Sequence, residues 1–304
     1  MPDLAILYEH PQWFAPLFST LERRGIDYEA FAATGHMFDP EAPPPAPVLF
    51  NRVAMSSFLR TPDHPIFYAQ ALMAHWRGRG ARVINDADVL AVDASKARQL
   101  SLLSSLGLGI PATRVVHRPA DLAAASASLR FPVVVKANIG GSGAGIARFD
   151  DAATLAAFAA ENMVPDSVDK VLLVQEYVPM REGRITRIET LAGRFLYAID
   201  IDGGGGFDLC PADACLAEPG KPAITITEAR PSPELIAAAE RIAAAARLDV
   251  GGIEVMIDDR DGVARFYDIN ALSNFVANPI EILGYDPHEK LVDWLEAVIA
   301  EAKA

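Results

Sequence analysis

The feature that most constrains this chain is the stretch 266–275, an apolar segment that presents an acid and an amide two residues apart. In a strand, residues i and i+2 share a face, so Asp268 and Asn270 point the same way. A second apolar segment, 252–257, carries a lone acid, Glu254. If the two segments pair as a hairpin, three hard oxygen ligands converge, which suits Mg²⁺. Strand-end polar groups that simply face water are the alternative.

Composition narrows the class of partner. With 304 residues, of which 51% are hydrophobic and 22% charged, the chain is long enough for two or three globular subdomains. Its net charge of −13 argues against nucleic acid and anionic membrane surfaces as partners. We expect neither a secretory signal nor a membrane span, and therefore a cytoplasmic protein. The oligomeric state stays open, with a homo-oligomer among the alternatives.

The two cysteines, Cys210 and Cys215, lie four residues apart with no other Cys or His nearby. A zinc site would lack ligands there, so we expect reduced cytosolic thiols.

The first 94 residues predict a small α/β unit. A strand at 4–8, a helix at 16–24 and a strand at 26–31 form a β-α-β opening that is typical of a parallel, Rossmann-like sheet. The first strand is not followed by a glycine-rich turn, so the dinucleotide fingerprint is absent. Further strands are predicted at 48–53 and 81–85, and a helix at 66–77.

Beyond this unit, Asp93 and Ser95 are candidate N-caps for a helix at 96–106. Lys96 falls in the first turn of that helix, where a cation opposes the helix dipole. The pattern then predicts strands at 114–117, 131–138, 146–149 and 171–178, two strands between 187 and 200 with a turn at 192–193, and helices at 119–128, 152–160, 233–248 and 288–303.

A glycine-rich loop, 140–145, follows the strand that ends near Lys136. Its glycines and Ser142 expose backbone N–H groups that can wrap a polyphosphate. It is not a Walker P-loop, because no Gly-Lys-Ser/Thr follows and a strand comes next. The arrangement predicts a hairpin flap over phosphates, and a glycine hairpin without a ligand is the alternative. The pattern disfavours a dinucleotide fingerprint, since no helix follows the glycines.

The segment 175–179 ends a strand with a proline that stops pairing. Free backbone groups at such a hinge can hydrogen-bond an adenine edge, although the segment is equally typical of an ordinary strand end.

The order of these features resembles the ATP-grasp superfamily. It runs Lys96, Lys136 with the glycine loop, the hinge, Arg187, Glu254 and Asp268-x-Asn270. The chain looks most like the branch of ribosomal-protein glutamate ligases and related carboxylate–amine ligases, over nearly its whole length. The resemblance implies an α/β ATP-grasp fold: an N-terminal Rossmann-like pre-ATP-grasp domain (1–94), a central subdomain with the flap (95–176) and a C-terminal subdomain with the metal site (177–304).

The resemblance also implies roles for particular residues. ATP and Mg²⁺ are the implied cofactors, with Mn²⁺ as an alternative metal. Arg52, at the end of the strand 48–53, would bind a substrate carboxylate, and a surface arginine is the alternative. The phosphates would be held by Lys96 and Lys136, under the flap residues Gly141, Ser142, Gly143 and Gly145. The adenine hinge would be formed by Glu176, Tyr177 and Val178. Catalysis would involve Lys136 and Arg187, and the metal would be held by Glu254, Asp268 and Asn270.

Three departures from the family pattern concern the substrate side. Ile185 stands where the branch has a ribose-binding acid, which leaves Glu182 as a substitute. The region 206–213 replaces an Arg-Ser-Asn stretch. After Asn270, where Ser-Pro-Gly is common, this chain has Ala-Leu-Ser-Asn-Phe at 271–275, and we expect Ser273 and Asn274 to shape the acceptor pocket. Neither glutamate nor a ribosomal target is therefore carried over.

The sequence thus predicts a ligase that joins a small-molecule carboxylate to an amine through an acyl phosphate, releasing ADP and phosphate. Two alternatives remain open: the same ATP site serving a carboxylating or kinase-like reaction, and a non-catalytic nucleotide-binding regulatory protein. Neither substrate can be named from the sequence.

Overall fold

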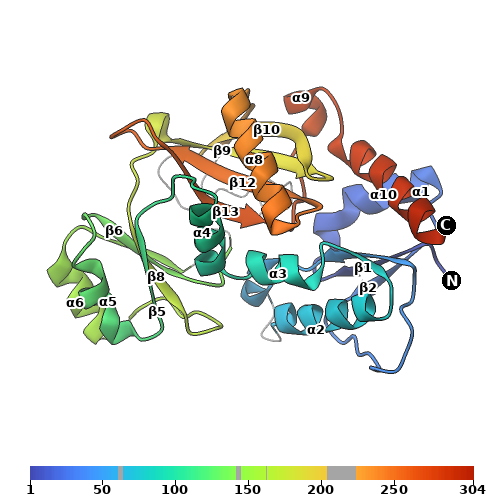
Figure 1. Cartoon of the computed structure of the whole chain (residues 1–304), viewed down its shortest axis with the longest axis horizontal. Helices are drawn as coiled ribbons and strands as arrows, with labels where there is room; N and C mark the ends of the chain where they lie inside the picture. Colours follow the sequence, from blue (N-terminus) through green and yellow to red (C-terminus); the bar gives the residue numbers. More distant parts are fainter. Residues whose placement is uncertain (61–63, 142–144, 162, 204–223) are drawn as a thin grey trace.

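The computed structural model describes residues 1–60, 64–141, 145–161, 163–203 and 224–304. The described strands form three sheets, with four strands in the N-terminal sheet, four in the central sheet and five in the C-terminal sheet (Figure 1). Cys210, Cys215 and the stretch 206–213 lie outside the described residues.

The N-terminal sheet is parallel throughout, in the order β2-β1-β3-β4, which confirms the predicted Rossmann-like opening. The apolar run of the first strand is almost completely buried. The first helix ends at Gly25, whose φ of 70° suits glycine at a helix C-terminus. The elements are β1 (Leu4–Tyr8), η1 (Pro11–Phe14), α1 (Ala15–Arg24), β2 (Tyr28–Ala32), β3 (Val48–Arg52), η2 (Met55–Leu59), α2 (Pro65–Gly78) and β4 (Arg82–Ile84).

The central sheet is antiparallel, in the order β5-β8-β6-β7, and two short helices cover one of its faces (Figure 1). Val133 and Val135 belong to the core beneath these helices. Val134 and Lys136 alternate with them and so point to the opposite face. The elements are β5 (Thr113–Val116), η3 (Pro119–Asp121), α5 (Leu122–Ser126), β6 (Val133–Ala137), β7 (Ile146–Phe149), α6 (Ala152–Ala160) and β8 (Leu172–Glu176).

The C-terminal sheet is antiparallel, in the order β11-β10-β9-β12-β13. The predicted hairpin forms, with Glu254 opposite Asp268. A bulge follows: Val255 pairs with Phe266, which leaves Tyr267 without a partner in the register. The elements are η4 (Arg181–Gly183), β9 (Arg184–Leu191), β10 (Arg194–Asp202), β11 (Thr225–Glu228), α8 (Pro233–Ala246), β12 (Val250–Ile257) and β13 (Ala264–Asn270).

Two helices connect the N-terminal and central sheets, α3 (Ala87–Asp93) and α4 (Lys96–Ser105). The prediction that Asp93 caps a helix start is wrong, because Asp93 is the last residue of α3, a helix that the sequence pattern did not reveal. Ser95 is the true N-cap of α4, and its Oγ accepts a hydrogen bond from the Arg98 N–H.

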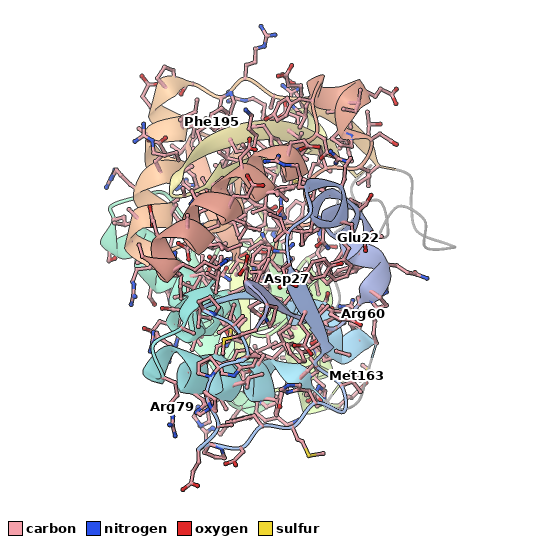
Figure 2. All side chains as sticks on the ribbon, turned by 90° about the vertical axis from the view of Figure 1, so that its right-hand side faces the viewer. Glu22, Asp27, Arg60, Arg79, Met163 and Phe195 are labelled. Atoms are coloured by element: carbon pink, nitrogen blue, oxygen red, sulfur yellow. The ribbon has the colours of Figure 1, made fainter. Side chains whose placement is uncertain are left out.

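The chain ends with α9 (Pro279–Leu283) and α10 (Pro287–Lys303). The last helix packs against α1 and β3, so the C-terminal segment returns to the N-terminal sheet (Figure 1). Leu295 of α10 shares one core with Ile6 and Ile201. Figure 2 gives a side view of these layers, with the exposed Arg79 at the periphery. No helix within the described ranges is long and apolar enough to cross a membrane.

Candidate active site

A pocket opens between the central and C-terminal sheets. The central sheet contributes Val134 and Lys136. The C-terminal sheet contributes Ile185 from β9 and Met256 from β12. The segment 175–178, predicted to be a hinge, runs along the cavity. The remaining lining residues are Pro111, Ile146, Met180 and Tyr267.

The backbone of the hinge is held from both sides. The Glu176 N–H donates to Ala112 O and the Tyr177 N–H to Pro132 O, each at 2.9 Å. The Val178 N–H finds no acceptor in the part of the chain that the structure describes. One backbone donor at the cavity edge is therefore available to a ligand.

Lys136 lies inside the cavity wall and is 6% exposed. Its Nζ donates to Gln175 Oε1 at 2.9 Å, and the Gln175 amide in turn donates to Thr113 Oγ1 at 2.7 Å. Burial, aided by the positive charge of Lys96, lowers the pKa of Lys136 to about 7. An anionic ligand would favour the charged form of this amine.

Lys96 reaches from the first turn of α4 to β13, where its Nζ lies 2.9 Å from Asp268 Oδ1. Asn138 holds this turn, because its side-chain oxygen accepts from the Ala97 N–H and its carbonyl from the Lys96 N–H. Burial acts to lower the pKa of Lys96, but the negative charges of Asp268, Glu254 and Asp93 together outweigh it and raise the pKa above its usual value. The carboxylate offsets the unfavourable position of the cation on the helix dipole.

Arg187 of β9 links two buried acids. Its Nε lies 2.7 Å from Glu189 Oε1, and its Nη1 lies 3.0 Å from Glu254 Oε1. The guanidinium lies directly over Gly252, where an added Cβ would be 2.5 Å from the Arg187 side chain. Only glycine leaves this space, so the bare backbone of β12 defines where the arginine head can lie.

The structure brings Glu254, Asp268 and Asn270 together. The Asn270 amide contacts Glu254 Oε1 at 3.3 Å, and Glu254 and Asp268 are register partners. Burial and the nearby Asp268 charge raise the pKa of Glu254. Ile269 is 1% exposed and faces the opposite core, as the alternation predicts.

This donor set suits Mg²⁺, since two carboxylates and an amide supply hard oxygen atoms. Among the described residues there is no group of three or more His, Cys, Asp or Glu side chains that could hold a metal ion. A cation bound by Glu254, Asp268 and Asn270 would therefore need oxygen atoms from a ligand, which is how Mg²⁺ binds in phosphate-processing sites.

Arg52 is buried, which excludes the alternative of a surface arginine; it is 2% exposed. Its Nη2 donates to the Ser273 carbonyl and lies 3.2 Å from Asn274 Oδ1, and the guanidinium lies over the rings of Phe14 and Phe50. Its Nε and Nη1 have no hydrogen-bond partner within the described ranges. Burial lowers the pKa of Arg52 to about 9, which an anion placed on the two free donors would counteract.

Some predicted residues lie apart from this cluster. Glu182 is exposed, pairs with Arg184 at 2.6 Å and does not line the cavity. Gly141 lies against Ser56, where a Cβ would come within 2.8 Å. Gly145 is exposed with a φ of 68°. Ser142 and Gly143 lie outside the described residues.

Sequence reasoning assigned no role to three residues of the site, Glu189, Met256 and Tyr267, and gave Gln175 only a place in the hinge segment. The i+2 rule applied from Glu254 would have found Met256, since the two alternate with Val255. Tyr267 was not accessible to that rule, because the bulge turns it toward the cavity. Glu189 shows its relevance only through its buried contact with Arg187.

Comparison with known proteins shows which proteins this chain is similar to. A model of the RimK-like ATP-grasp domain matches residues 93–295. The probable alpha-L-glutamate ligase 1 of Pseudoalteromonas atlantica is 28% identical over 143 residues, which is 46% of this chain and 46% of that protein. The ribosomal protein bS6–L-glutamate ligase of Escherichia fergusonii is 24% identical over 233 residues, 76% of this chain and 72% of that protein.

The first of these alignments spans less than half the length of the relative. A solved structure covers more: the ATP-grasp ligase PsnB, complexed with a minimal precursor, Mg and ADP, has a TM-score of 0.68 and 17% identity over 98% of this chain and 97% of PsnB. This similarity confirms the predicted ATP-grasp fold.

Proposed function

The chain belongs to the RimK-like ATP-grasp family, and on this premise we propose that it is an ATP-dependent carboxylate–amine ligase. One observation carries the proposal: the ion pairs Lys96–Asp268 and Arg187–Glu254, together with Asn270, converge beside a hinge-lined cavity. Such a mixed cluster of cations and hard oxygen donors is what the transfer of a phosphoryl group needs.

In this proposal the cavity receives the adenine, and the free Val178 N–H binds its edge. Lys96 and Lys136 bind the phosphates, and the glycine loop covers them. Glu254, Asp268 and Asn270 hold Mg²⁺, which neutralises phosphate charge when bound. The three sheets support domain boundaries at 94/95 and 176/177 as part of the same proposal.

Arg52 is the proposed site for the substrate carboxylate, because its Nε and Nη1 are buried without a partner in the described structure. A buried guanidinium with free donors is costly unless a ligand satisfies them. Ser273 and Asn274 hold its third nitrogen and so orient the two free donors. The acid and amine remain open, because this loop departs from the pattern of the glutamate ligases.

The proposed reaction has two steps. A carboxylate oxygen attacks the γ-phosphorus, the bond to ADP breaks, and an acyl phosphate forms. The amine then attacks the acyl carbon, phosphate leaves, and the nitrogen loses a proton to give the amide. Arg187, oriented by Glu189, stabilises negative charge on the transferred oxygens.

The test is ADP and phosphate release by the purified chain with Mg·ATP, screened across pairs of acids and amines. We expect release that depends on both members of a pair, with the amide detected by mass spectrometry. Binding linkage should also raise the melting temperature in millimolar Mg·ATP. The absence of any such shift would refute the nucleotide site, and release with an acid alone would favour a kinase-like reaction. The cytoplasmic location and the oligomeric state stay predictions.

A further inference from the structure

β13 carries Asp268 and Asn270 and is an edge strand, with β12 on one side only. The outer edge of such a strand presents unpaired N–H and C=O groups that a protein must satisfy or protect. An unpaired edge has a second consequence in a strand that carries metal ligands. A shift of the strand backbone would move every metal ligand on that strand.

The side chain of Gln99 pairs with this open edge at Ile269. Its Oε1 accepts from the Ile269 N–H at 3.1 Å, and its Nε2 donates to the Ile269 carbonyl at 3.0 Å. Ile269 lies between the two candidate ligands, Asp268 and Asn270. The side chain of Gln99 is 1% exposed, and its second amide hydrogen goes to Asp93 O. The amide therefore completes the strand as a neighbouring strand would.

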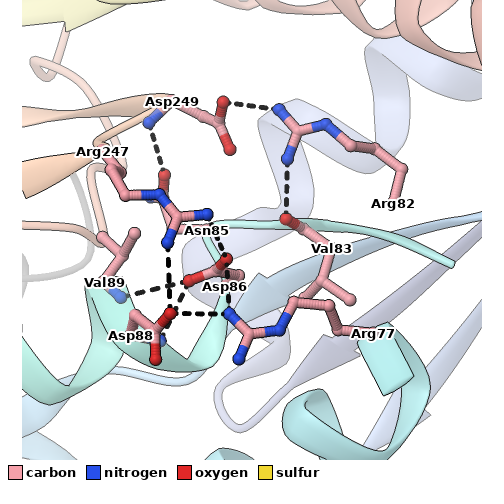
Figure 3. Close-up of polar contacts among 9 residues, drawn as sticks. All are labelled: Arg77, Arg82, Val83, Asn85, Asp86, Asp88, Val89, Arg247 and Asp249. Carbon is pink, nitrogen blue, oxygen red and sulfur yellow. Dashed lines mark hydrogen bonds and ion pairs between the residues drawn. The ribbon is translucent and has the colours of Figure 1, made fainter. Parts of the chain in front are cut away.

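Asn85 contacts the residue that follows the end of this strand. It follows β4 and is 2% exposed. Its Nδ2 donates to Ala271 O and Val250 O, both at 2.7 Å. Its Oδ1 accepts from the Asp249 N–H at 2.8 Å (Figure 3). One amide just after the last strand of the N-terminal sheet thus ties the start of β12 to the residue that follows Asn270.

We infer that Gln99 and Asn85 are positioning residues that fix the backbone of β13, and through it the directions of Asp268 and Asn270. The inference rests on the proposed function, since it concerns the metal ligands of that site. The side-chain hydrogen bonds of Gln99 and Asn85 all go to backbone groups, and none of them goes to the carboxylate of Glu254 or Asp268. Because Gln99 and Lys96 belong to the same helix, α4 delivers the cation to Asp268 and sets the strand that carries it.

The test uses the full chain with saturating ADP and Mn²⁺ as the probe, and follows free Mn²⁺ by electron paramagnetic resonance. Gln99→Met keeps the length of the side chain and removes its three hydrogen bonds. We expect Mn²⁺ to bind about tenfold more weakly to Gln99→Met than to the wild type, which is the usual scale for groups that orient metal ligands. The affinity for ADP measured in EDTA should stay unchanged, because the hinge and the cavity are intact.

Leu103→Val is the matched control, since Leu103 is a fully buried apolar residue of the same helix. It should lower the melting temperature while Mn²⁺ affinity stays that of the wild type. Gln99→Asn, which is too short to reach Ile269, replaces Gln99→Met if that variant does not fold. Wild-type Mn²⁺ affinity in the Gln99 variant, or an equal loss in Leu103→Val at equal stability, overturns the inference. If the wild type with ADP takes up no Mn²⁺, the proposed function itself fails and the inference falls with it.

Discussion

The two ends of the site differ in how their charges are satisfied. At the proposed phosphate end, Lys96 pairs with Asp268, and Arg187 pairs with Glu254 and Glu189. At the proposed acceptor end, Arg52 keeps two donors without a partner in the described structure. Glu189 Oε2 is likewise buried without one, and its charge acts on Arg52.

This difference indicates how far each end of the site is organised before a ligand binds. Cations and acids that neutralise one another remain organised without a ligand, so the phosphate end can be largely pre-formed. A buried guanidinium with free donors costs stability, and such a cost persists in proteins mainly where function requires it. The acceptor end should therefore be the end where removing a residue harms binding and spares the fold.

The largest expected effect is at the phosphate end. Asn270→Ala removes one of the three hard oxygen donors, and we expect turnover at saturating substrates to fall by about 100-fold or more. Steady-state ADP release with Mg·ATP measures this. Asn274→Ala is the matched control: it removes an amide from the acceptor end and should change the KM for the acid more than turnover. Full activity in Asn270→Ala would remove the metal assignment.

The next effect separates binding from folding at Arg52. Arg52→Met keeps much of the side-chain volume and removes a buried charge whose donors are only partly used. We expect the KM for the acid to rise roughly tenfold to 100-fold, with the KM for ATP unchanged. The melting temperature should stay the same or rise, because replacing a poorly paired buried charge with an apolar group is often neutral or stabilising. A clear fall in melting temperature with an unchanged KM would make Arg52 a structural residue.

Much of this arrangement could be predicted from the sequence, because it depends on local periodicity. The alternation around Asp268 and Asn270, the apolar run of the first strand and the glycine stop at Gly25 all act over a few residues. The ordered set of lysines, acids and Asn270 then supported the family resemblance that the domain match confirms.

The rest depends on contacts between distant segments. Gln99 and Asn85 read as ordinary polar residues, and only the edge position of β13 gives them a role. Tyr267 enters the cavity through a bulge that no alternation rule predicts. Asp93 looked like a helix cap because its residue type favours caps, but α3 already occupied that position.

A moderate effect is expected at Gly252, where the phosphate end depends on a missing side chain. Gly252→Ala places a Cβ within 2.5 Å of the Arg187 guanidinium, which must move away from Glu254. The head of a long side chain moves at low cost, so we expect a small loss of melting temperature and about a tenfold loss of turnover. Gly78→Ala is the control, since a Cβ there meets nothing within 4 Å and the change should be neutral or slightly stabilising. Equal effects of the two changes on turnover would contradict the assigned place of Arg187.

The smallest effect concerns the stability of the β12–β13 turn in acid. Asp258 is fully buried where the β12–β13 turn meets the hinge, and hydrogen bonds from Arg260 lower its pKa to about 2, below the ordinary value of 3.8. A depressed carboxylate pKa stabilises the fold above the unfolded-state value, and that stabilisation is lost as the pH falls toward the folded-state value. Urea denaturation should therefore show Asp258→Asn less stable than the wild type at pH 7, with the gap closing between about pH 4 and pH 2. Arg52→Met should show no such closing, because the hydrogen bonds of Arg52 within the described residues go to Ser273 and Asn274 and not to a carboxylate. A gap for Asp258→Asn that is constant across this range would mean that the ion pair stabilises neither the turn nor the hinge it contacts.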